Sequence, residues 1–366
     1  MPKLKITSNS IFGPSPPSIF VGKFGYPNVY AGPLVSEDRS MIFSSTRELY
    51  GKNLENIISL TSVLLRTSKR VNVRKIENKI VEKSQEIAMS ERTIDTEIWV
   101  EKSYYLPHVD EFFHPTGPRI VPRRIDVVDN PAIPKKVDMI VEEKLKAERG
   151  IRELYQYGYD VDYIQRLLAS GVLGRDRRLV PTRWSITAVD DIASKALLKE
   201  VKLYESIDKI EYYHNKFMGN EFHIILIPGI WEYEMIESWM RGSIYSPHGY
   251  VGEGDYEPYE GRKDYASNIT GAYYAARLAV AESLYKRRRQ AKVLVYREIT
   301  PEYKLPLGVW VIREAVRHAL YNEPMIFETL SKALDFVEQR THLKGWPKKS
   351  KIVFNLRHQK RIEDFL

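Results

Sequence analysis

The sequence contains no cysteine among its 366 residues. This absence excludes disulfide bonds, thiolate nucleophiles and cysteine-ligated zinc, so that only histidine and carboxylate side chains could hold a metal ion. No apolar run reaches the roughly 20 residues that a membrane-spanning helix requires. The opening residues, MPKLKITSNS, lack the apolar segment of a secretory signal. We therefore expect a cytoplasmic protein without a membrane partner.

Several catalytic signatures are also missing. The eight histidines are never spaced i and i+4, and the sequence has no Gly-x-Ser-x-Gly motif, so it gives little support to serine-hydrolase chemistry. The Gly- and Pro-rich stretch SNSIFGPSPPSIFVGKFGYPNVYAGPL, near the N-terminus, has neither a GKS or GKT ending nor a GxGxxG spacing. Its backbone N–H groups could still cradle a phosphate, or the stretch could simply be rigid strands and turns packed on the domain.

Positive charge is abundant and unevenly distributed. The chain carries 56 Lys and Arg residues against 48 Asp and Glu residues, a net charge of +8. The segments YKRRRQAK (285–292) and KGWPKKSKIVFNLRHQKR (344–361) concentrate the excess. Such a balance favours a polyanionic partner, most often nucleic acid. Arg287, Arg288 and Arg289 end a predicted helix, where they could complement the helix dipole or contact DNA phosphates.

The apolar pattern predicts a mixed α/β fold in which a β-hairpin and short strands pack with several amphipathic helices. Helical spacing of apolar residues predicts helices at 46–69, 77–91, 139–158, 160–171, 231–242, 270–289 and 308–322. Alternating or β-rich patterns predict strands at 93–102 and 291–299 and a hairpin at 209–229, with short extended pieces near the N-terminus. Residues 114–138 are expected to be irregular. Asp160 is placed to cap one helix and Gly171 to end it.

A polar, glycine-rich stretch at 246–265 suggests a junction between domains. We expect an N-terminal α/β domain over residues 1–245, a C-terminal α/β domain over 246–343, and a basic tail over 344–366.

The segment LVPTRWSITAVDDIASK (179–195) is the densest cluster of functional side chains. Arg183 and Trp184 are expected just before a short strand, and Asp190 and Asp191 just after it. Arg183 could bind a phosphate and Trp184 could stack on a base, while the two carboxylates could hold a divalent metal ion. Alternatively, the aspartates could simply cap the helix that follows.

A second cluster follows the glycine-rich stretch, in DYEPYEGRKDY (255–265) and YREITPEYK. Glu257, Glu260 and Glu298 could serve a metal-dependent nuclease together with a lysine, because the metal neutralises developing phosphate charge. Such a catalyst would use Mg²⁺ or Mn²⁺, and the sequence establishes no cofactor with certainty. Lys263 would contact DNA. The alternative is a solvated, charged loop.

The chain ends in QKRIEDFL. Gln359, Ile362, Phe365 and Leu366 stand at spacings that place them on one face of a short helical turn. This octet resembles the PCNA-interacting peptide, with Leu366 where a second aromatic residue is common. The resemblance implies the PCNA sliding clamp as a partner, with an affinity on the order of micromolar, about −8 kcal/mol.

Several longer blocks resemble the archaeal Nre DNA repair family from about residue 10 to the end of the chain. They are SPPSIFVGKFGYPNVYAGPL, LVPTRWSITAVDD, GRKDYASNITGAYYAARLAVAE, RRRQAKVLVYREITPEY and PLGVWVIREAVR. The resemblance implies a role in DNA damage repair with recruitment by the sliding clamp. Many members open with a four-cysteine zinc motif, which this chain lacks, and the resemblance implies no particular catalytic mechanism.

Together these patterns predict a nucleoid-associated archaeal repair protein that binds DNA and is held there by the clamp. Three activities stay open at this point. The body could be a metal-dependent enzyme acting on DNA, a non-catalytic DNA-binding adaptor, or a nucleotide-binding transferase that uses the Gly- and Pro-rich segment, Arg183 and a carboxylate.

Overall fold

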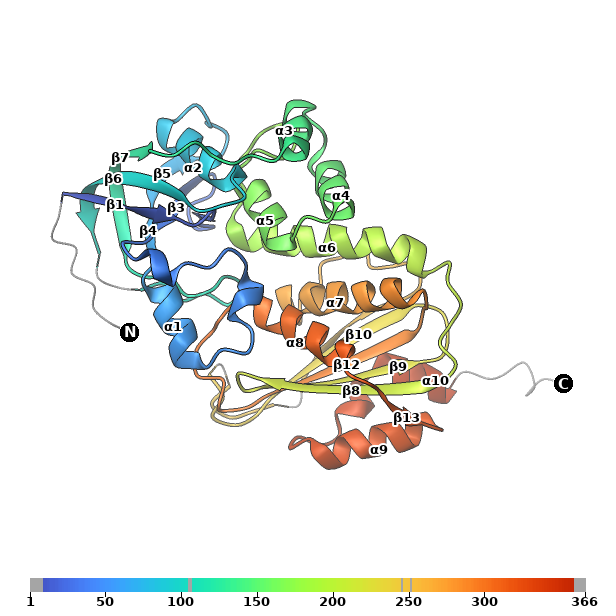
Figure 1. The fold of residues 1–366 in the computed structure, drawn as a ribbon. Helices are drawn as coiled ribbons and strands as arrows, with labels where there is room; N and C mark the ends of the chain where they lie inside the picture. The colour runs from blue at the N-terminus through green and yellow to red at the C-terminus, as the bar shows by residue number, and fades with distance from the viewer. Residues whose placement is uncertain (1–8, 105–106, 245, 251, 359–366) are drawn as a thin grey trace. The chain divides into compact units, whose positions relative to one another are not determined.

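A computed structural model describes residues 9–104, 107–244, 246–250 and 252–358. Two compact units make up the chain. Unit 1 comprises Met1–Ala193 and Pro306–Trp310, and unit 2 comprises Ser194–Leu305 and Val311–Leu366. Each unit contains a mixed sheet with helices, which confirms the predicted mixed α/β class (Figure 1). The domain boundaries expected at residues 245 and 343 stay predictions.

Unit 1 is built around a sheet with the strand order β1-β6-β7-β4-β3-β2, in which β5 also pairs with β3. Its strands are β1 (Ser10–Ser15), β2 (Ile19–Val21), β3 (Asn28–Val35), β4 (Leu65–Thr67), β5 (Lys69–Asn72), β6 (Ile94–Ser103) and β7 (Arg119–Val127). Its helices are η1 (Arg39–Met41), η2 (Thr46–Leu49), α1 (Leu54–Ser62), α2 (Lys79–Met89), α3 (Lys135–Glu142), α4 (Ala147–Tyr157) and α5 (Val161–Ala169). The boundary between the units falls inside α6 (Thr182–Val201).

Unit 2 has a sheet with the strand order β11-β10-β12-β9-β8-β13. Its strands are β8 (Ile210–Phe217), β9 (Asn220–Ile227), β10 (Glu232–Trp239), β11 (Gly254–Glu257), β12 (Lys292–Ile299) and β13 (Met325–Phe327). Its helices are α7 (Gly271–Arg287), α8 (Trp310–Tyr321), α9 (Leu330–Arg340), η3 (Trp346–Lys349) and α10 (Lys351–His358). The strands β10 and β12 run parallel, whereas the other neighbouring pairs in this sheet are antiparallel.

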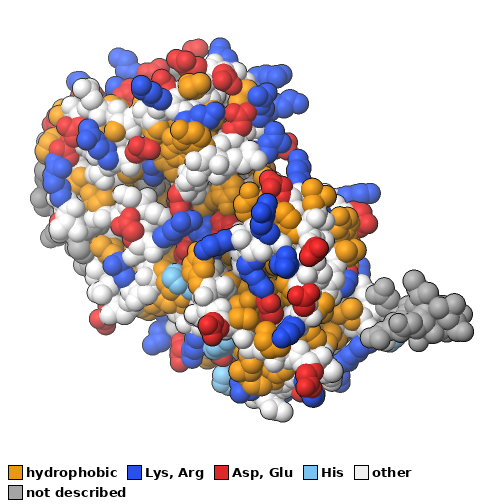
Figure 2. Space-filling model, turned by 45° about the vertical axis from the view of Figure 1, so that its right-hand side comes forward, with side chains coloured by type: hydrophobic (Ala, Val, Ile, Leu, Met, Phe, Trp, Pro, Cys, Tyr) orange, Lys and Arg blue, Asp and Glu red, His pale blue; other side chains and the backbone are white. Residues whose placement is uncertain are grey.

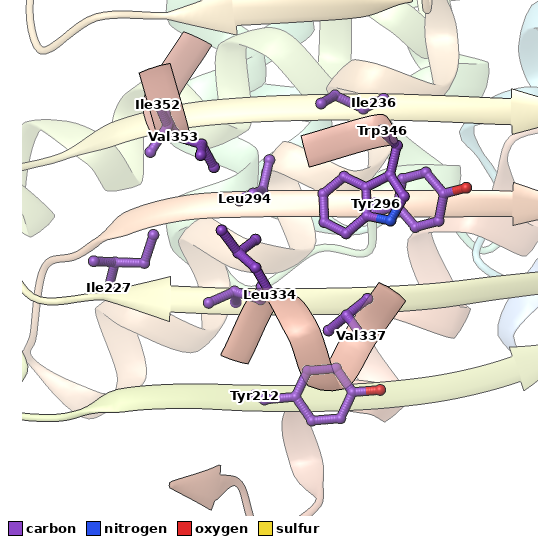
Figure 3. Packing of buried hydrophobic residues seen from close by; sticks show 11 residues of the cluster. Tyr212, Ile227, Ile236, Leu294, Tyr296, Leu334, Val337, Trp346, Ile352 and Val353 are labelled. Atoms are coloured by element: carbon purple, nitrogen blue, oxygen red, sulfur yellow. The ribbon is translucent and has the colours of Figure 1, made fainter. Parts of the chain in front are cut away.

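Both faces of the unit 2 sheet are covered by helices (Figure 1). On one face, α9, η3 and α10 bury an apolar cluster in which the Trp346 ring stacks on Tyr296 with centroids 4.2 Å apart (Figure 3). On the other face, the Tyr233 hydroxyl donates to the Tyr273 carbonyl of α7, and the Asn215 amide donates to the Ala315 carbonyl of α8. Unit 2 is therefore a three-layer α/β/α arrangement.

Most predicted elements are confirmed: the extended N-terminal pieces, α2, β6, the β8–β9 hairpin, α7, β12 and α8. Asp160 caps α5 as expected, because its Oδ1 accepts from the Asp162 backbone N–H at 2.8 Å. Gly171 follows the end of that helix with a φ of +77°, a conformation that glycine adopts without steric cost. None of the helices in the described ranges is long and apolar enough to cross a membrane.

Three predictions were wrong for physical reasons. The predicted helix at 231–242 is the strand β10, which β11 and β12 flank and which is buried on both faces, so it shows no simple alternation. The predicted helix at 46–69 ends at Ser62 and is followed by β4 and β5. Residues 114–138, expected to be irregular, contain β7 and the start of α3, and the proline at position 122 lies beside a bulge, where strands tolerate proline.

The basic C-terminal segment is folded at least to residue 358. Trp346, Ile352 and Val353 are buried against the sheet. Glu234 of β10 accepts from the Ser350 hydroxyl (2.6 Å) and from the backbone N–H groups of Lys351 (2.7 Å) and Ile352. A buried carboxylate thus caps the first turn of α10, where the helix dipole favours negative charge.

Candidate nucleic-acid interface

A pocket of about 220 Å³ lies in unit 1, where the β2–β3 loop, β4, β7 and the start of α6 meet. Its polar lining consists of Lys23, Arg66, Ser68, His108, Asp110, Arg119, Thr182 and Arg183. Phe20, Phe24, Tyr30 and Phe113 supply its aromatic walls. The pocket therefore combines several cations with aromatic rings.

The sheet and α6 position the three arginines. Arg66 on β4 and Arg119 on β7 are direct partners in the parallel register of the two strands. Arg183 is the second residue of α6, and the Thr182 hydroxyl beside it accepts from the Val21 N–H of β2 at 2.8 Å. This bond ties the start of the helix to the strand that leads into the Gly- and Pro-rich loop. The predicted phosphate-binding residue and the predicted phosphate-cradling segment thus line the same pocket.

Aromatic rings fix the orientation of each guanidinium. Arg66 lies over the Phe20 ring at 4.7 Å, Arg119 over Tyr104 at 4.0 Å, and Arg183 over Phe112 at 3.9 Å. Cation–π contacts of this kind each contribute on the order of 1 kcal/mol while leaving the edge of the guanidinium available for hydrogen bonds. These aromatic contacts orient the three guanidinium groups and leave their positive charge unchanged.

The positive charge of the pocket is only partly compensated, because the Asp110 carboxylate in its lining favours the charged form of Arg66 without forming an ion pair with it. Within the described ranges, no carboxylate forms an ion pair with Arg66 or Arg119, and the Nε atoms of both are buried without a hydrogen-bond partner. Burial and the nearby Arg119 charge lower the pKa of Arg66 to about 10. Arg66 therefore stays charged near neutral pH. A partly buried cation that no carboxylate of the described residues contacts directly is costly unless an anion binds it, so the pocket suits an anionic ligand.

His108 adds a neutral polar group to the same wall. Burial, followed by the Arg66 charge, lowers the pKa of His108 to about 4. Its ring meets Phe20 edge-on with centroids 5.0 Å apart, and its Nε2 has no hydrogen-bond partner among the residues that the structure describes. His108 can therefore donate to, or accept from, a bound molecule without adding charge.

Large aromatic side chains near this pocket are exposed to solvent. Phe24 is 81% exposed, and Tyr26, Tyr30, Tyr104 and Trp184 are each exposed by more than a third. The Trp184 and Tyr26 rings lie 5.4 Å apart. Exposed rings beside arginines are the features by which proteins bind single-stranded nucleic acid, since the rings stack on bases and the arginines contact phosphates.

The aspartates predicted beside Arg183 have a different environment from the one expected. The segment that joins Arg183 to the two aspartates is part of the helix α6 and not a short strand. Neither Asp190 nor Asp191 therefore caps the start of a helix. Asp190 is fully buried and accepts from the Gln165 amide at 3.1 Å. The buried residues Ile186, Val189 and Ala193 recur every three or four positions, which is the spacing of a helix rather than of a strand.

Glu257 and Glu298 lie on opposite faces of the unit 2 sheet. Glu257 pairs with Tyr233 on β10, and Tyr233 pairs with Val293 on β12. Glu298 is an odd number of residues from Val293, so its side chain points to the other face. These two carboxylates cannot share a metal ion. Glu260 is exposed in the loop that follows β11.

Both buried glutamates already have partners. Glu257 forms a buried ion pair with Arg277 and accepts from the Trp231 indole N–H at 3.1 Å. Glu298 accepts from the His342 backbone N–H at 3.0 Å, from the Leu343 N–H at 2.8 Å, and interacts with the His342 ring at 2.7 Å. Glu298 thus anchors the loop between α9 and η3.

The other predicted DNA contacts belong to unit 2. Arg287 is bound to both carboxylate oxygens of Glu211 at 2.7 Å. Arg288 and Lys263 are exposed, and Arg289 is half-buried. On the face that Figure 2 shows, Lys and Arg side chains are interspersed with Asp and Glu side chains, so no single continuous basic patch covers it. Gln359, Ile362, Phe365 and Leu366 lie outside the described residues.

Sequence reasoning missed Arg66, Arg119, Lys23 and the surrounding tyrosines. Each arginine lies in a strand beside threonine, proline or apolar residues, and a single strand arginine ordinarily points to solvent. Only the pairing of β4 with β7 brings the two together. The nearest available signal was the density of aromatic residues around Lys23.

The fold and the pocket define a protein of two mixed α/β units, one of which carries a pocket lined by arginines and aromatic rings. The chain belongs to the archaeal Nre family. The family described as "Archaeal Nre, N-terminal" matches residues 2–246, and "Archaeal Nre, C-terminal" matches residues 257–365.

Curated relatives agree with this assignment. The chain is 40% identical to "DNA repair protein NreA" of Archaeoglobus fulgidus, over 94% of this chain and 88% of that relative. It is 38% identical to the protein of the same name in Haloferax volcanii, over 90% and 82%. It is 36% identical to "DNA repair protein NreB" of Archaeoglobus fulgidus, over 96% and 92%. No solved structure matches the chain.

Proposed function

We propose that this chain is a DNA repair protein that binds DNA through the arginine- and aromatic-lined pocket of unit 1. The relatives named DNA repair proteins support the repair role. The observation that carries the DNA-binding proposal is the pair of facing arginines, Arg66 and Arg119, which aromatic rings hold and which form no ion pair with a carboxylate of the described residues.

The bound form of DNA is proposed to contain an unpaired segment. A strand phosphate lies against Arg66, Arg119 and Arg183, while an unstacked base lies against Trp184 or Tyr30. A flat duplex surface would leave these exposed rings without a partner, whereas single strands, flaps and gaps offer base faces. Lys263, Arg288 and Arg289 of unit 2 stay candidates for further phosphate contacts.

The test is the affinity of the full chain for a fluorescent single-stranded oligonucleotide, measured by anisotropy over a range of salt concentrations. Arg119→Gln is expected to weaken binding at least tenfold at low salt. It should also reduce the magnitude of the slope of log K against log salt concentration by about 0.7 for each lost phosphate contact. Arg124→Gln is the matched control, because Arg124 lies on the same strand but pairs with Asp126 at 2.6 Å. Equal weakening by both variants would contradict the proposal.

Recruitment to DNA is proposed to depend on the PCNA sliding clamp, and the protein would then be associated with the nucleoid. The support is the octet QKRIEDFL, in which Gln359, Ile362, Phe365 and Leu366 match the clamp-binding pattern. Tethering raises the local concentration of the pocket near DNA, so a modest intrinsic affinity suffices. Phe365→Ala should abolish clamp binding in a pull-down, and Lys360→Gln should preserve it; clamp binding that survives Phe365→Ala would refute this recruitment.

A second candidate is the binding of a free nucleotide in the same pocket. The observation that favours it is the meeting of the Gly- and Pro-rich β2–β3 loop, Arg183 and Asp110 around one enclosed volume. Calorimetry with mononucleotides distinguishes the two candidates. Tight nucleotide binding with weak oligonucleotide binding would favour a nucleotide-dependent transferase.

Catalysis is tested separately. Purified protein is incubated with nicked, flapped and cross-linked DNA, with and without Mg²⁺ or Mn²⁺. Cleavage that is lost in Glu260→Gln or Asp191→Asn would favour a metal-dependent enzyme. Salt-sensitive retardation of the DNA without any turnover would favour a non-catalytic adaptor.

A further inference from the structure

Unit 2 contains a cluster of histidines and glutamates that the DNA-binding proposal does not use. His214 of β8 faces His223 of β9 across the antiparallel register, and Glu221 lies two residues before His223 on the same strand. Residues at i and i+2 of a strand point to the same face of a sheet. The three side chains therefore converge on the face that also carries Tyr212 and Tyr296 (Figure 3).

The donor atoms of the cluster are close together. One ligand atom each from His214, Glu221 and His223 lie within 4.8 Å of one another. The His214 Nε2 is 2.9 Å from the Glu221 Oε1, and the His223 Nε2 is 3.7 Å from the same oxygen. Ligands of a tetrahedral Zn²⁺ ion, at about 2.1 Å from the metal, are about 3.4 Å from one another. The observed spacings bracket that separation.

His223 is an incompletely satisfied buried residue. Its side chain is 0% exposed, and its Nδ1 lies 2.9 Å from the Tyr212 hydroxyl. Its Nε2 makes no hydrogen bond to any residue that the structure describes and is aimed toward the Glu221 carboxylate. A buried nitrogen without a hydrogen-bond partner is destabilising unless a ligand occupies it. In metal-binding histidines, one ring nitrogen commonly forms a hydrogen bond while the other nitrogen binds the metal.

We propose that His214, Glu221 and His223 form a binding site for a divalent first-row transition metal ion such as Zn²⁺ or Mn²⁺. Two imidazoles and one carboxylate are a donor set suited to these metals rather than to Mg²⁺, which prefers oxygen ligands.

The site is open on one side. His214 is 41% exposed at its side chain, so water can reach the metal and complete its coordination, as in catalytic rather than structural zinc sites. Glu298 and His342 lie next to the site, since their donor atoms and that of Glu221 are also within 4.8 Å of one another. Glu298 therefore anchors the loop between α9 and η3 and also places negative charge beside the proposed metal ion.

The experiment is calorimetric titration of the metal-free full chain with Zn²⁺ and, separately, with Mn²⁺. One equivalent should bind. His214→Ala and Glu221→Gln should each weaken binding at least about tenfold, and the visible absorption of Co²⁺-loaded protein should change in the same variants. Circular dichroism checks that the variants fold, which is expected because His214 lies at the surface.

The matched control is His248→Ala, which removes an exposed histidine outside the cluster. It should leave affinity and spectrum unchanged. Absence of stoichiometric binding to the wild-type chain would overturn the proposal, as would equal weakening by His248→Ala and His214→Ala.

Discussion

The two units differ in how they hold their buried and half-buried arginines. In unit 2, Arg277 is paired with Glu257, Arg297 with Glu237, and Arg317 with Glu282 and Glu314. In unit 1, Arg66 and Arg119 are held by aromatic rings, and within the described part of the chain neither has a carboxylate partner in ion-pair contact. Removing one member of a buried ion pair destabilises a fold because it leaves the other charge buried, whereas a cation at a pocket without a direct ion pair is available for a ligand.

The comparison changes the interpretation of charged residues. Glu257 was a candidate for catalysis from the sequence, yet its environment in unit 2 is that of a structural ion pair. Arg183 was a candidate for phosphate binding, and it lines the unit 1 pocket described above together with Arg66 and Arg119. Whether a charged residue forms an ion pair inside the fold, rather than its residue type, thus distinguishes structural residues from candidate ligand-binding residues.

The largest expected effect is on the stability of unit 2. Arg277→Gln leaves Glu257 buried without its cation, and breaking such a pair costs about 3–5 kcal/mol. Denaturant unfolding should show this loss, whereas Arg119→Gln in unit 1 should change the free energy of unfolding by less than about 1 kcal/mol. Equal losses would remove the distinction between the units.

A pH-dependent effect tests the buried histidine of unit 1. Burial lowers the pKa of His114 to about 4, and its Nδ1–H donates to the Pro115 carbonyl at 2.8 Å. The unfolded chain binds a proton at His114 more readily than the folded chain does. The contribution of His114 to the free energy of unfolding is therefore present above pH 6.5 and is lost as the pH falls toward 4. The difference in the free energy of unfolding between the wild-type chain and His114→Gln should therefore shrink by about 3 kcal/mol over this pH range. Thermal unfolding at several pH values measures it, and a constant difference would contradict the assignment.

Trp184→Ala is expected to act on DNA binding alone. Loss of one base-stacking ring costs about 1–3 kcal/mol, and Trp184 is 46% exposed, so the fold should tolerate the change. Anisotropy with a single-stranded oligonucleotide measures the loss. Tyr321→Ala, which removes an exposed tyrosine of unit 2, serves as the control and should leave affinity within twofold.

The smallest effect is expected at the helix end in unit 2. Arg288→Gln removes an exposed cation and should change the free energy of unfolding by less than about 0.5 kcal/mol. Arg287→Gln breaks the bidentate ion pair with Glu211, so it should lower the free energy of unfolding more than Arg288→Gln does. Chemical denaturation of both variants gives the difference, and a larger cost for Arg288→Gln would contradict the pairing described here.

The elements with strong local signals were predictable from the sequence. The cap at Asp160, the β8–β9 hairpin and α7 follow from residue pattern alone. The strand β10 was not predictable in this way, because a strand buried on both faces loses its alternation. The pocket was not predictable either, since Arg66 and Arg119 are 53 residues apart and meet only through strand register.

The most direct test of the account is a crystal structure of the full chain with a short single-stranded oligonucleotide. The account predicts a phosphate within hydrogen-bond distance of Arg66 and Arg119, with a base against Trp184 or Tyr30. An oligonucleotide bound elsewhere, with this pocket empty, would contradict it.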